Sequence, residues 1–204
     1  FQFYAMFIYW QFVALSIGQS VFGVAPETDP AAYQEAVGWS GLLNGTYNFF
    51  TAVSALFLLR FVIRFGGRWT HAACLVIGGV CMAWLSNVDN QWLSLIPMIG
   101  IGIMWASIVG VPYLMVASMV PSNRSGVYMG ILNTMIVVPM LIETLTFGWV
   151  YENLLGSDPT AAILLAGILM VVGAIALLGV KPPSDADDSS LVPLGRPNES
   201  ITTY

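Results

Sequence analysis

The sequence predicts an all-α integral membrane protein with six transmembrane helices. Apolar residues make up 57% of the 204 residues and charged residues only 8%, whereas a soluble domain carries about a quarter charged residues. The chain contains six apolar runs of about 20 residues or more, the length that a helix needs to cross a hydrocarbon core of about 30 Å. Lipid offers no hydrogen-bond partner to the backbone, so continuous runs of this length indicate helices and exclude barrel strands.

The six runs follow one another along the first 180 residues. Neither a basic segment nor a small-residue cleavage site precedes the first run, so we do not expect it to be a secretory signal peptide. The chain begins at Phe1 without an initiator methionine, and we therefore expect its natural start to lie upstream. The predicted spans are Phe3–Val24, Val37–Val62, Thr70–Val88, Trp92–Val120, Gly126–Tyr151 and Thr160–Val180.

Charge placement predicts the orientation of these spans. All basic residues fall in connections on one side of the predicted bundle, and the alternate connections carry only acidic charge. Because Lys and Arg favour cytoplasmic loops, we expect a multi-pass protein of the cell (inner) membrane with both termini in the cytoplasm. Residues 1–181 form the predicted transmembrane domain, and residues 182–204, rich in polar residues and proline, form a predicted disordered cytoplasmic tail. The basic residues are Arg60, Arg64, Arg68, Arg124, Lys181 and Arg196.

A resemblance to a known family covers nearly the whole chain up to Val180. The segment from Gly102 to Gly148 reads GIMWASIVGVPYLMVASMVPSNRSGVYMGILNTMIVVPMLIETLTFG. It resembles helices ten and eleven of the sucrose-transporter-like branch of the major facilitator superfamily, which is related to the glycoside-pentoside-hexuronide symporters. Upstream, YWQFVALSIGQSVFG and EAVGWSGLLNGTYNFF look like helices seven and eight. The segment RFVIRFGGRW has the arginines and glycines of the superfamily's cytoplasmic loop motif but lacks its aspartate.

The resemblance implies that the chain is the C-terminal six-helix half of a twelve-helix transporter. In such a protein the substrate is held near the membrane midplane between two halves and released by alternating access. The implied partners are a small-molecule substrate, most simply a sugar, together with protons, the lipid bilayer and a missing N-terminal half.

Small and amide residues form stripes on two of the predicted helices. Gly41, Asn44 and Gly45 recur at helical spacing on the second helix, and Gly126, Gly130 and Asn133 recur on the fifth. Such stripes either allow close helix packing or line a polar pathway. In the family the second and fifth helices of each half meet the opposite half, so we also expect these stripes to mark that interface.

Glu143 is the only ionisable side chain deep inside a predicted span. An isolated carboxylate in hydrocarbon is costly, so a partner must compensate it. It binds and releases the coupling proton, accepts hydrogen bonds from sugar hydroxyls, or pairs with a polar group near the extracellular end. Its position about 7 Å outward of the helix midpoint favours the structural alternative.

Sugar recognition requires aromatic faces for the apolar surface of the ring and polar side chains for its hydroxyls. Tryptophan and tyrosine near helix ends instead belong to the interfacial aromatic belt, as we expect for Trp69, Trp92, Trp149 and Tyr151. The substrate-binding candidates are Trp10, Gln11, Trp39, Asn44, Tyr113 and Asn133.

The remaining reactive residues indicate no enzyme. We expect His71 to be a polar residue at the cytoplasmic end of its helix, and Cys74 and Cys81 to be packing residues without a disulfide or metal. The sequence has no nucleotide-binding glycine loop, metal cluster or activated nucleophile, so no cofactor, metal or nucleic-acid partner is predicted. The sequence-based hypothesis is a proton-coupled sugar symporter. The alternatives are a transporter coupled to sodium or carrying another small polar solute, and a non-transporting membrane sensor or assembly subunit.

Overall fold

A computed structural model describes residues 1–119 and 125–179, and every regular element in these ranges is helical. The described residues contain six helices long and apolar enough to cross a membrane, which confirms the predicted fold class. A short π-helical segment, η1, continues the first helix. The elements are α1 (Gln2–Ile17), η1 (Gly18–Phe22), α2 (Pro30–Phe65), α3 (Gly67–Leu85), α4 (Leu95–Met119), α5 (Ser125–Asn153) and α6 (Pro159–Leu178).

Helix α2 begins seven residues before the predicted start at Val37, because a cap starts it in a polar segment. The Asp29 carboxylate accepts a hydrogen bond from the Ala32 backbone N–H at 3.0 Å, and Pro30 occupies the first turn. Both features favour helix initiation. Glu35, which precedes the predicted span, therefore lies on α2. Asp158 and Pro159 start α6 in the same way, with a bond of 2.8 Å from the Thr160 backbone N–H.

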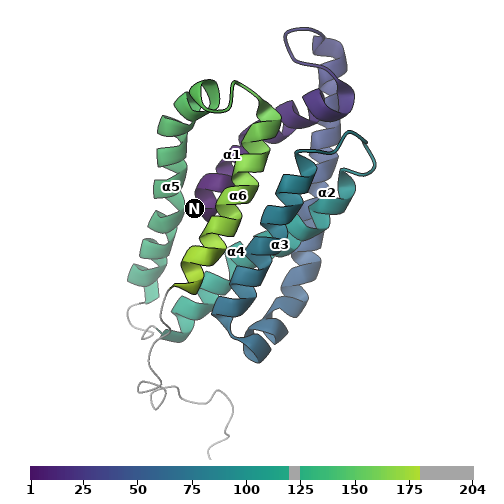
Figure 1. Cartoon of the computed structure of the whole chain (residues 1–204). Helices are drawn as coiled ribbons and strands as arrows, with labels where there is room; N and C mark the ends of the chain where they lie inside the picture. Colours follow the sequence, from purple (N-terminus) through teal and green to yellow (C-terminus); the bar gives the residue numbers. More distant parts are fainter. Residues whose placement is uncertain (120–124, 180–204) are drawn as a thin grey trace, which may run out of the picture.

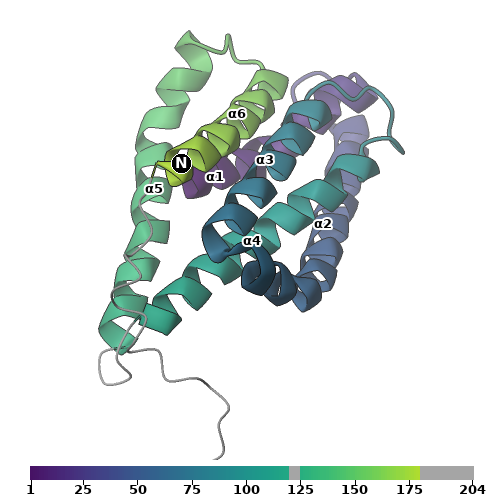
Figure 2. The same ribbon diagram turned by 60° about the horizontal axis from the view of Figure 1, so that its bottom comes forward.

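Helices α1, α3, α4 and α6 form the centre of the bundle and supply most of its buried side chains. Helix α2 packs on α4, and α5 packs mainly on α1. Figures 1 and 2 show α2 and α5 at opposite margins of this central group. The two marginal helices bury few side chains, so each keeps a long face free within the described bundle.

Glycines permit the closest helix contacts. A Cβ atom built on Gly79 of α3 would lie 2.6 Å from the carbonyl oxygen of Gly167 on α6, and one on Gly167 would lie 2.6 Å from the Gly79 oxygen. Gly102 of α4 meets α2 in the same way, 2.6 Å from the Tyr47 carbonyl oxygen. Backbones can approach this closely only where no side chain intervenes.

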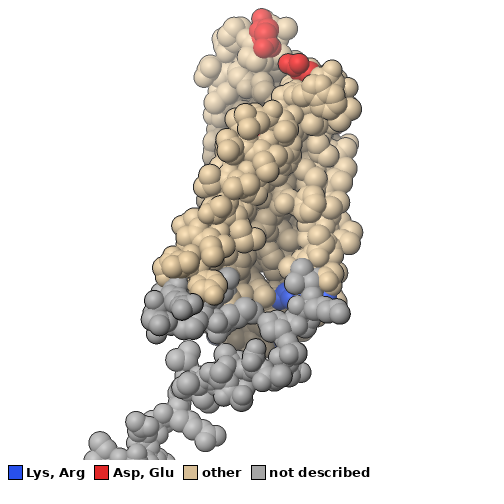
Figure 3. Space-filling model, turned by 90° about the vertical axis from the view of Figure 1, so that its left-hand side faces the viewer, with Lys and Arg blue, Asp and Glu red and all other residues tan. Residues whose placement is uncertain are grey.

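The described charges separate along the bundle. Acidic side chains lie at the end formed by the connections after η1 and α5, and basic side chains lie near the opposite end (Figure 3). This separation agrees with the charge pattern of the sequence, while the cytoplasmic placement of the basic end stays a prediction. Arg124, Lys181, Arg196 and the tail 182–204 lie outside the described residues.

Candidate functional site

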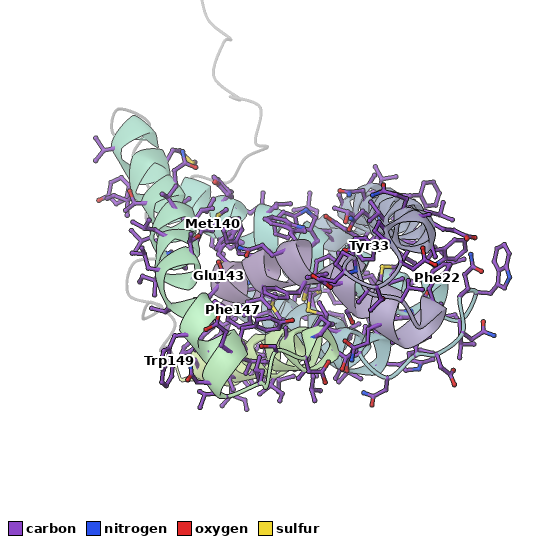
Figure 4. The ribbon with its side chains drawn as sticks, turned by 90° about the horizontal axis from the view of Figure 1, so that it is seen from above. Phe22, Tyr33, Met140, Glu143, Phe147 and Trp149 are labelled. Carbon is purple, nitrogen blue, oxygen red and sulfur yellow. The ribbon has the colours of Figure 1, made fainter. Side chains whose placement is uncertain are left out.

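Glu143 joins α5 to α1. Its side chain is 0% exposed, and its Oε2 atom accepts a hydrogen bond of 3.0 Å from Nε2 of Gln11. Figure 4 shows Met140, Glu143 and Phe147 along the side of α5 that faces the bundle, whereas Trp149 points away. The spacing of three and four residues places these three side chains on one helix face.

The second carboxylate oxygen of Glu143, Oε1, is buried and has no hydrogen-bond partner among the described residues. The neighbouring Thr144 hydroxyl instead donates to the Met140 carbonyl at 3.0 Å. No basic side chain forms a salt bridge with Glu143 in the part of the chain that is described. The carboxyl group is therefore held by the neutral amide of Gln11, with the neutral Thr144 hydroxyl beside it and Oε1 available for a proton or a ligand.

A second polar cluster joins α1 to α2. The Tyr9 hydroxyl donates to Oδ1 of Asn44 at 3.2 Å, and the Trp10 indole N–H donates to the Tyr47 hydroxyl at 3.1 Å. The Tyr9 and Tyr47 rings meet edge to face with their centroids 5.9 Å apart. Trp10 and Gln11 are adjacent in sequence, and successive side chains of a helix point about 100° apart. Helix α1 therefore directs Trp10 toward α2 and Gln11 toward α5.

Aromatic rings surround Trp10. Its ring meets that of Trp105 on α4 edge to face at 5.3 Å and that of Phe7 at 6.4 Å. Edge-to-face pairs fix ring orientation beyond what apolar burial alone does. Asn44 is half-buried and Gln11 is exposed, so the polar groups beside this aromatic wall border an open face of the bundle.

The sequence matches the family model of the Major Facilitator Superfamily over residues 1–201. The chain belongs to the major facilitator superfamily. A search of curated proteins and a search of solved structures found no match. Membership of this superfamily identifies the chain as a membrane transporter protein in general, and the narrower sucrose-transporter-like branch stays a prediction.

Two of the predicted substrate-binding residues, Tyr113 and Asn133, contact each other at a different height along the bundle from Glu143. The Tyr113 hydroxyl of α4 donates to Oδ1 of Asn133 on α5 at 3.1 Å. Asn133 precedes Glu143 by ten residues, or about 15 Å of helix. Tyr113 and Asn133 therefore form a separate link between α4 and α5, on the side of Glu143 toward the basic end.

Trp39 is apart from the Trp10 cluster. Its indole N–H donates to the Ser94 hydroxyl at 3.0 Å, and its ring meets Trp92 edge to face at 5.3 Å. These partners belong to the connection between α3 and α4. The structure thus brings Trp10, Asn44 and Tyr9 together, and Gln11 with Glu143, but it does not bring Trp39 to them.

The predicted interface glycines face open space. A Cβ atom on Gly41, Gly45, Gly126 or Gly130 would meet nothing within 4 Å. Close packing within the described bundle therefore does not explain these residues. A polar pathway and an interface with another six-helix half both stay predictions for these stripes.

The arginines of the connection between α2 and α3 occupy two environments. Arg60 and Arg64 are exposed on the last turns of α2. Arg68, at the start of α3, is half-buried and donates a hydrogen bond to the Leu178 carbonyl at the end of α6. Arg68 thus binds an otherwise unpaired carbonyl of a helix end, whereas Arg60 and Arg64 keep their charges free for other contacts.

His71 lies in the second turn of α3, near the helix end as predicted, but it does not lie at an interface. Its side chain is buried inside the bundle, where Nδ1 lies 2.7 Å from the Ser107 hydroxyl and Nε2 lies 3.0 Å from Oε1 of Gln2. His71 therefore links α3 to α4 and to α1. The spacing of His71 from the apolar residues of α3 could have indicated that it faces the bundle. Its closeness in sequence to Arg68 suggested a helix-end position instead.

Sequence reasoning also missed Tyr47 and Trp105, which complete the cluster around Trp10. Each is an aromatic residue in an apolar helix and carries no distinguishing pattern. Tyr47 lies three residues after Asn44 and four after the buried Leu43. That spacing places Tyr47 on the inward side of α2, and it was the only signal for its role.

Proposed function

We propose that this chain is the C-terminal six-helix half of a secondary active transporter that couples sugar movement to protons by alternating access. The observation that carries the proposal is the hydrogen bond between Gln11 and the buried Glu143, in which a carboxyl group without a cationic partner among the described residues joins two helices. An ionisable group at such a depth is expensive to bury, and in membrane proteins such groups mark ion and substrate pathways.

The environment of Glu143 suits reversible protonation. A protonated carboxyl group is neutral, so its burial costs far less than burial of the charged form. The amide of Gln11 supports the group in either form, because its N–H donates to an oxygen that is an acceptor in both states. No fixed positive charge competes with the proton among the described residues. Glu143 can therefore gain and lose a proton as its access to water changes.

The packing of α5 provides a route for that change in access. Helix α5 contacts chiefly α1, and its face away from α1 is open. A small movement of α5 relative to α1 would separate Gln11 from Glu143 and admit water to the carboxyl group. This is the kind of rigid-element motion that alternating access requires.

The cluster around Trp10 has the chemistry that a sugar needs. The half-buried Trp10 ring offers an apolar face, while Gln11 and Asn44 offer amide donors and acceptors for hydroxyl groups. These amides border the open face of the bundle. A substrate at this face would lie beside Glu143, so binding and protonation would share Gln11.

The proposal requires a second six-helix half opposite the open faces of α2 and α5. We therefore place the decisive experiment in the full-length protein, with both halves present, reconstituted into liposomes. Uptake of radiolabelled mono- and disaccharides is measured under an inward proton gradient, an inward sodium gradient and no gradient. We expect accumulation of at least one sugar only with the proton gradient, abolished by a protonophore.

Other outcomes separate the alternatives. Accumulation that depends on the sodium gradient at clamped pH would show that sodium, and not the proton, is the coupling ion. Accumulation of a different small polar solute, with no sugar transported, would overturn the sugar assignment. Absence of any transport, with correct folding, would favour a sensor or assembly role.

A further inference from the structure

An apolar groove lies between α2 and α3 at the basic end of the bundle. It has a volume of about 830 Å³ and takes no part in the proposed transport site. Its walls are aromatic and aliphatic, and the polar side chains among its described lining residues are chiefly those of Ser54 and Thr70. We call it the α2–α3 groove; its principal lining residues are Phe57, Phe61, Phe65, Trp69, Cys74 and Ile103.

The groove follows from the divergence of α2 from α3. The two helices meet at Gly66, whose positive φ of 80° turns the chain sharply, and α2 packs on α4 rather than along α3. Phe57, Phe61 and Phe65 recur every four residues, so they stack along one side of α2. Leu58, buried with Cys74, forms the floor of the groove.

The α2–α3 groove faces away from the expected position of the second half. At about 100° per residue, Phe57 and Phe61 lie about 160° and 200° around α2 from Gly41. The stripe of Gly41 and Gly45 is the face that we assign to the other half. The side of α2 away from this stripe packs on α4 through Leu43 and Tyr47. Farther along, where α2 diverges from α3, Phe57, Phe61 and Phe65 are exposed, and in a membrane-spanning bundle the groove that they line is open to lipid.

Positive charge borders the groove. Arg60 and Arg64 are exposed and lie one turn apart on α2. The Arg64 guanidinium lies 5.3 Å from the centroid of the Phe65 ring, and Phe65 lines the groove. The described Asp and Glu side chains lie at the other end or, in Glu143, inside the bundle, so none of these described carboxylates neutralises the two arginines.

We propose that the α2–α3 groove binds an anionic phospholipid, with one acyl chain in the groove and the headgroup phosphate on Arg64 and Arg60. Apolar walls account for the acyl chain, because burial of each methylene group is favourable. Guanidinium groups bind phosphate through paired hydrogen bonds, and basic pockets between transmembrane helices at the cytoplasmic side bind anionic headgroups. The proposal is independent of the sugar and of the coupling ion.

Trp69 in the groove wall supplies a direct probe. The purified full-length protein in detergent is titrated with phosphatidylglycerol or phosphatidylcholine carrying brominated acyl chains, which quench tryptophan fluorescence on contact. The component due to Trp69 is the difference between the wild type and Trp69→Phe. We expect this component to be quenched saturably, and at lower concentrations of phosphatidylglycerol than of phosphatidylcholine.

The charge requirement is tested with Arg60→Gln, Arg64→Gln and the double variant, all on exposed side chains. Each substitution is expected to weaken phosphatidylglycerol binding about five-fold. The loss for phosphatidylcholine should be smaller, because its choline cation offsets the phosphate charge. Arg196→Gln, after the sixth helix, is the matched control and should change neither.

Three results would overturn the proposal. Equal affinities for the two lipids would show an unspecific apolar surface. An equal loss in Arg196→Gln would show a general charge effect. A Trp69 component that neither lipid quenches would mean that protein, such as a second copy or the other half, covers the groove.

Discussion

Gln11 is exposed whereas its partner Glu143 is fully buried, so their hydrogen bond connects the open face of the bundle to its interior. The amide is well matched to this place. It donates to the carboxyl group without adding a charge, and its own oxygen can accept a hydrogen bond from a ligand. A lysine here would form an ion pair and hold Glu143 permanently ionised.

Replacing Gln11 with leucine tests the energetic role of this bond. Gln11→Leu removes the one described partner of the buried carboxyl group, and we expect the free energy of unfolding to fall by about 2 kcal/mol. The double variant Gln11→Leu/Glu143→Leu should recover most of that loss, because two apolar partners leave no unpaired polar group. Thermal unfolding in detergent measures both. Additive losses in the double variant would contradict the pairing.

His71 offers a second test at this scale. His71→Leu leaves the Ser107 hydroxyl and the Gln2 amide oxygen without their histidine partner in the bundle, and we expect a destabilisation of about 2 kcal/mol. The same variant should keep the pH dependence of transport, since the account assigns the coupling proton to Glu143. A shifted pH profile of uptake in a stably folded His71→Leu would make His71 part of the proton pathway.

At the scale of elements, the six spans were predictable and their packing faces were not. Long apolar runs report that a segment lies in lipid, which determined the number and order of the helices. The first two turns of α2 were missed because Asp29 and Pro30 start the helix ahead of the long apolar run, in a segment interrupted by Gln34 and Glu35. Hydropathy also cannot show which glycines pack, so Gly79 and Gly167 were overlooked while Gly41 and Gly45 were singled out.

The candidate site was predictable only in part, for the same reason. Glu143, Gln11, Trp10 and Asn44 stood out because polar or indole groups are costly in a span. Tyr47 and Trp105 did not, because an aromatic residue in an apolar helix is ordinary. Its role depends on which neighbouring helix it meets, and that is a property of the tertiary structure.

Glycines that pack against another helix, such as Gly79, and glycines that face open space, such as Gly41, predict different effects of substitution. Gly79→Leu places a side chain where α6 backbone atoms lie within 2.6 Å of the Cβ position, so we expect the six-helix unit to lose about 3 kcal/mol or more of stability. Gly41→Leu projects into open space and should leave that stability unchanged while weakening association with the second half. Thermal unfolding and co-purification of separately expressed halves measure the two effects. Equal melting temperatures for the two variants would refute the assignment.

At the scale of the whole molecule, the distribution of charge predicts the orientation of the protein in the membrane, and α2 and α5 present open faces. Basic side chains gather at one end and acidic side chains at the other, which predicts that the basic end is cytoplasmic. The marginal helices α2 and α5 leave long faces unoccupied on either side of α1. In the function that we propose, these six helices form one wall of a transport pathway.

Single cysteines test the orientation. After Cys74 and Cys81 are replaced by alanine, a cysteine introduced at Asp89 should react with a membrane-impermeant maleimide in intact cells. A cysteine introduced at Arg64 should react only after permeabilisation. Labelling in the reverse pattern would invert the predicted topology and remove the cytoplasmic placement of the α2–α3 groove.

The most direct test of the central claim compares Glu143→Gln with Glu152→Gln in the full-length protein in liposomes. The amide in Glu143→Gln permanently mimics the protonated carboxyl group, while Glu152 is an exposed carboxylate on the same helix. We predict that Glu143→Gln abolishes sugar accumulation driven by a proton gradient but retains sugar exchange at equal pH, and that Glu152→Gln keeps both. Proton-driven accumulation that is unchanged in Glu143→Gln would contradict the account.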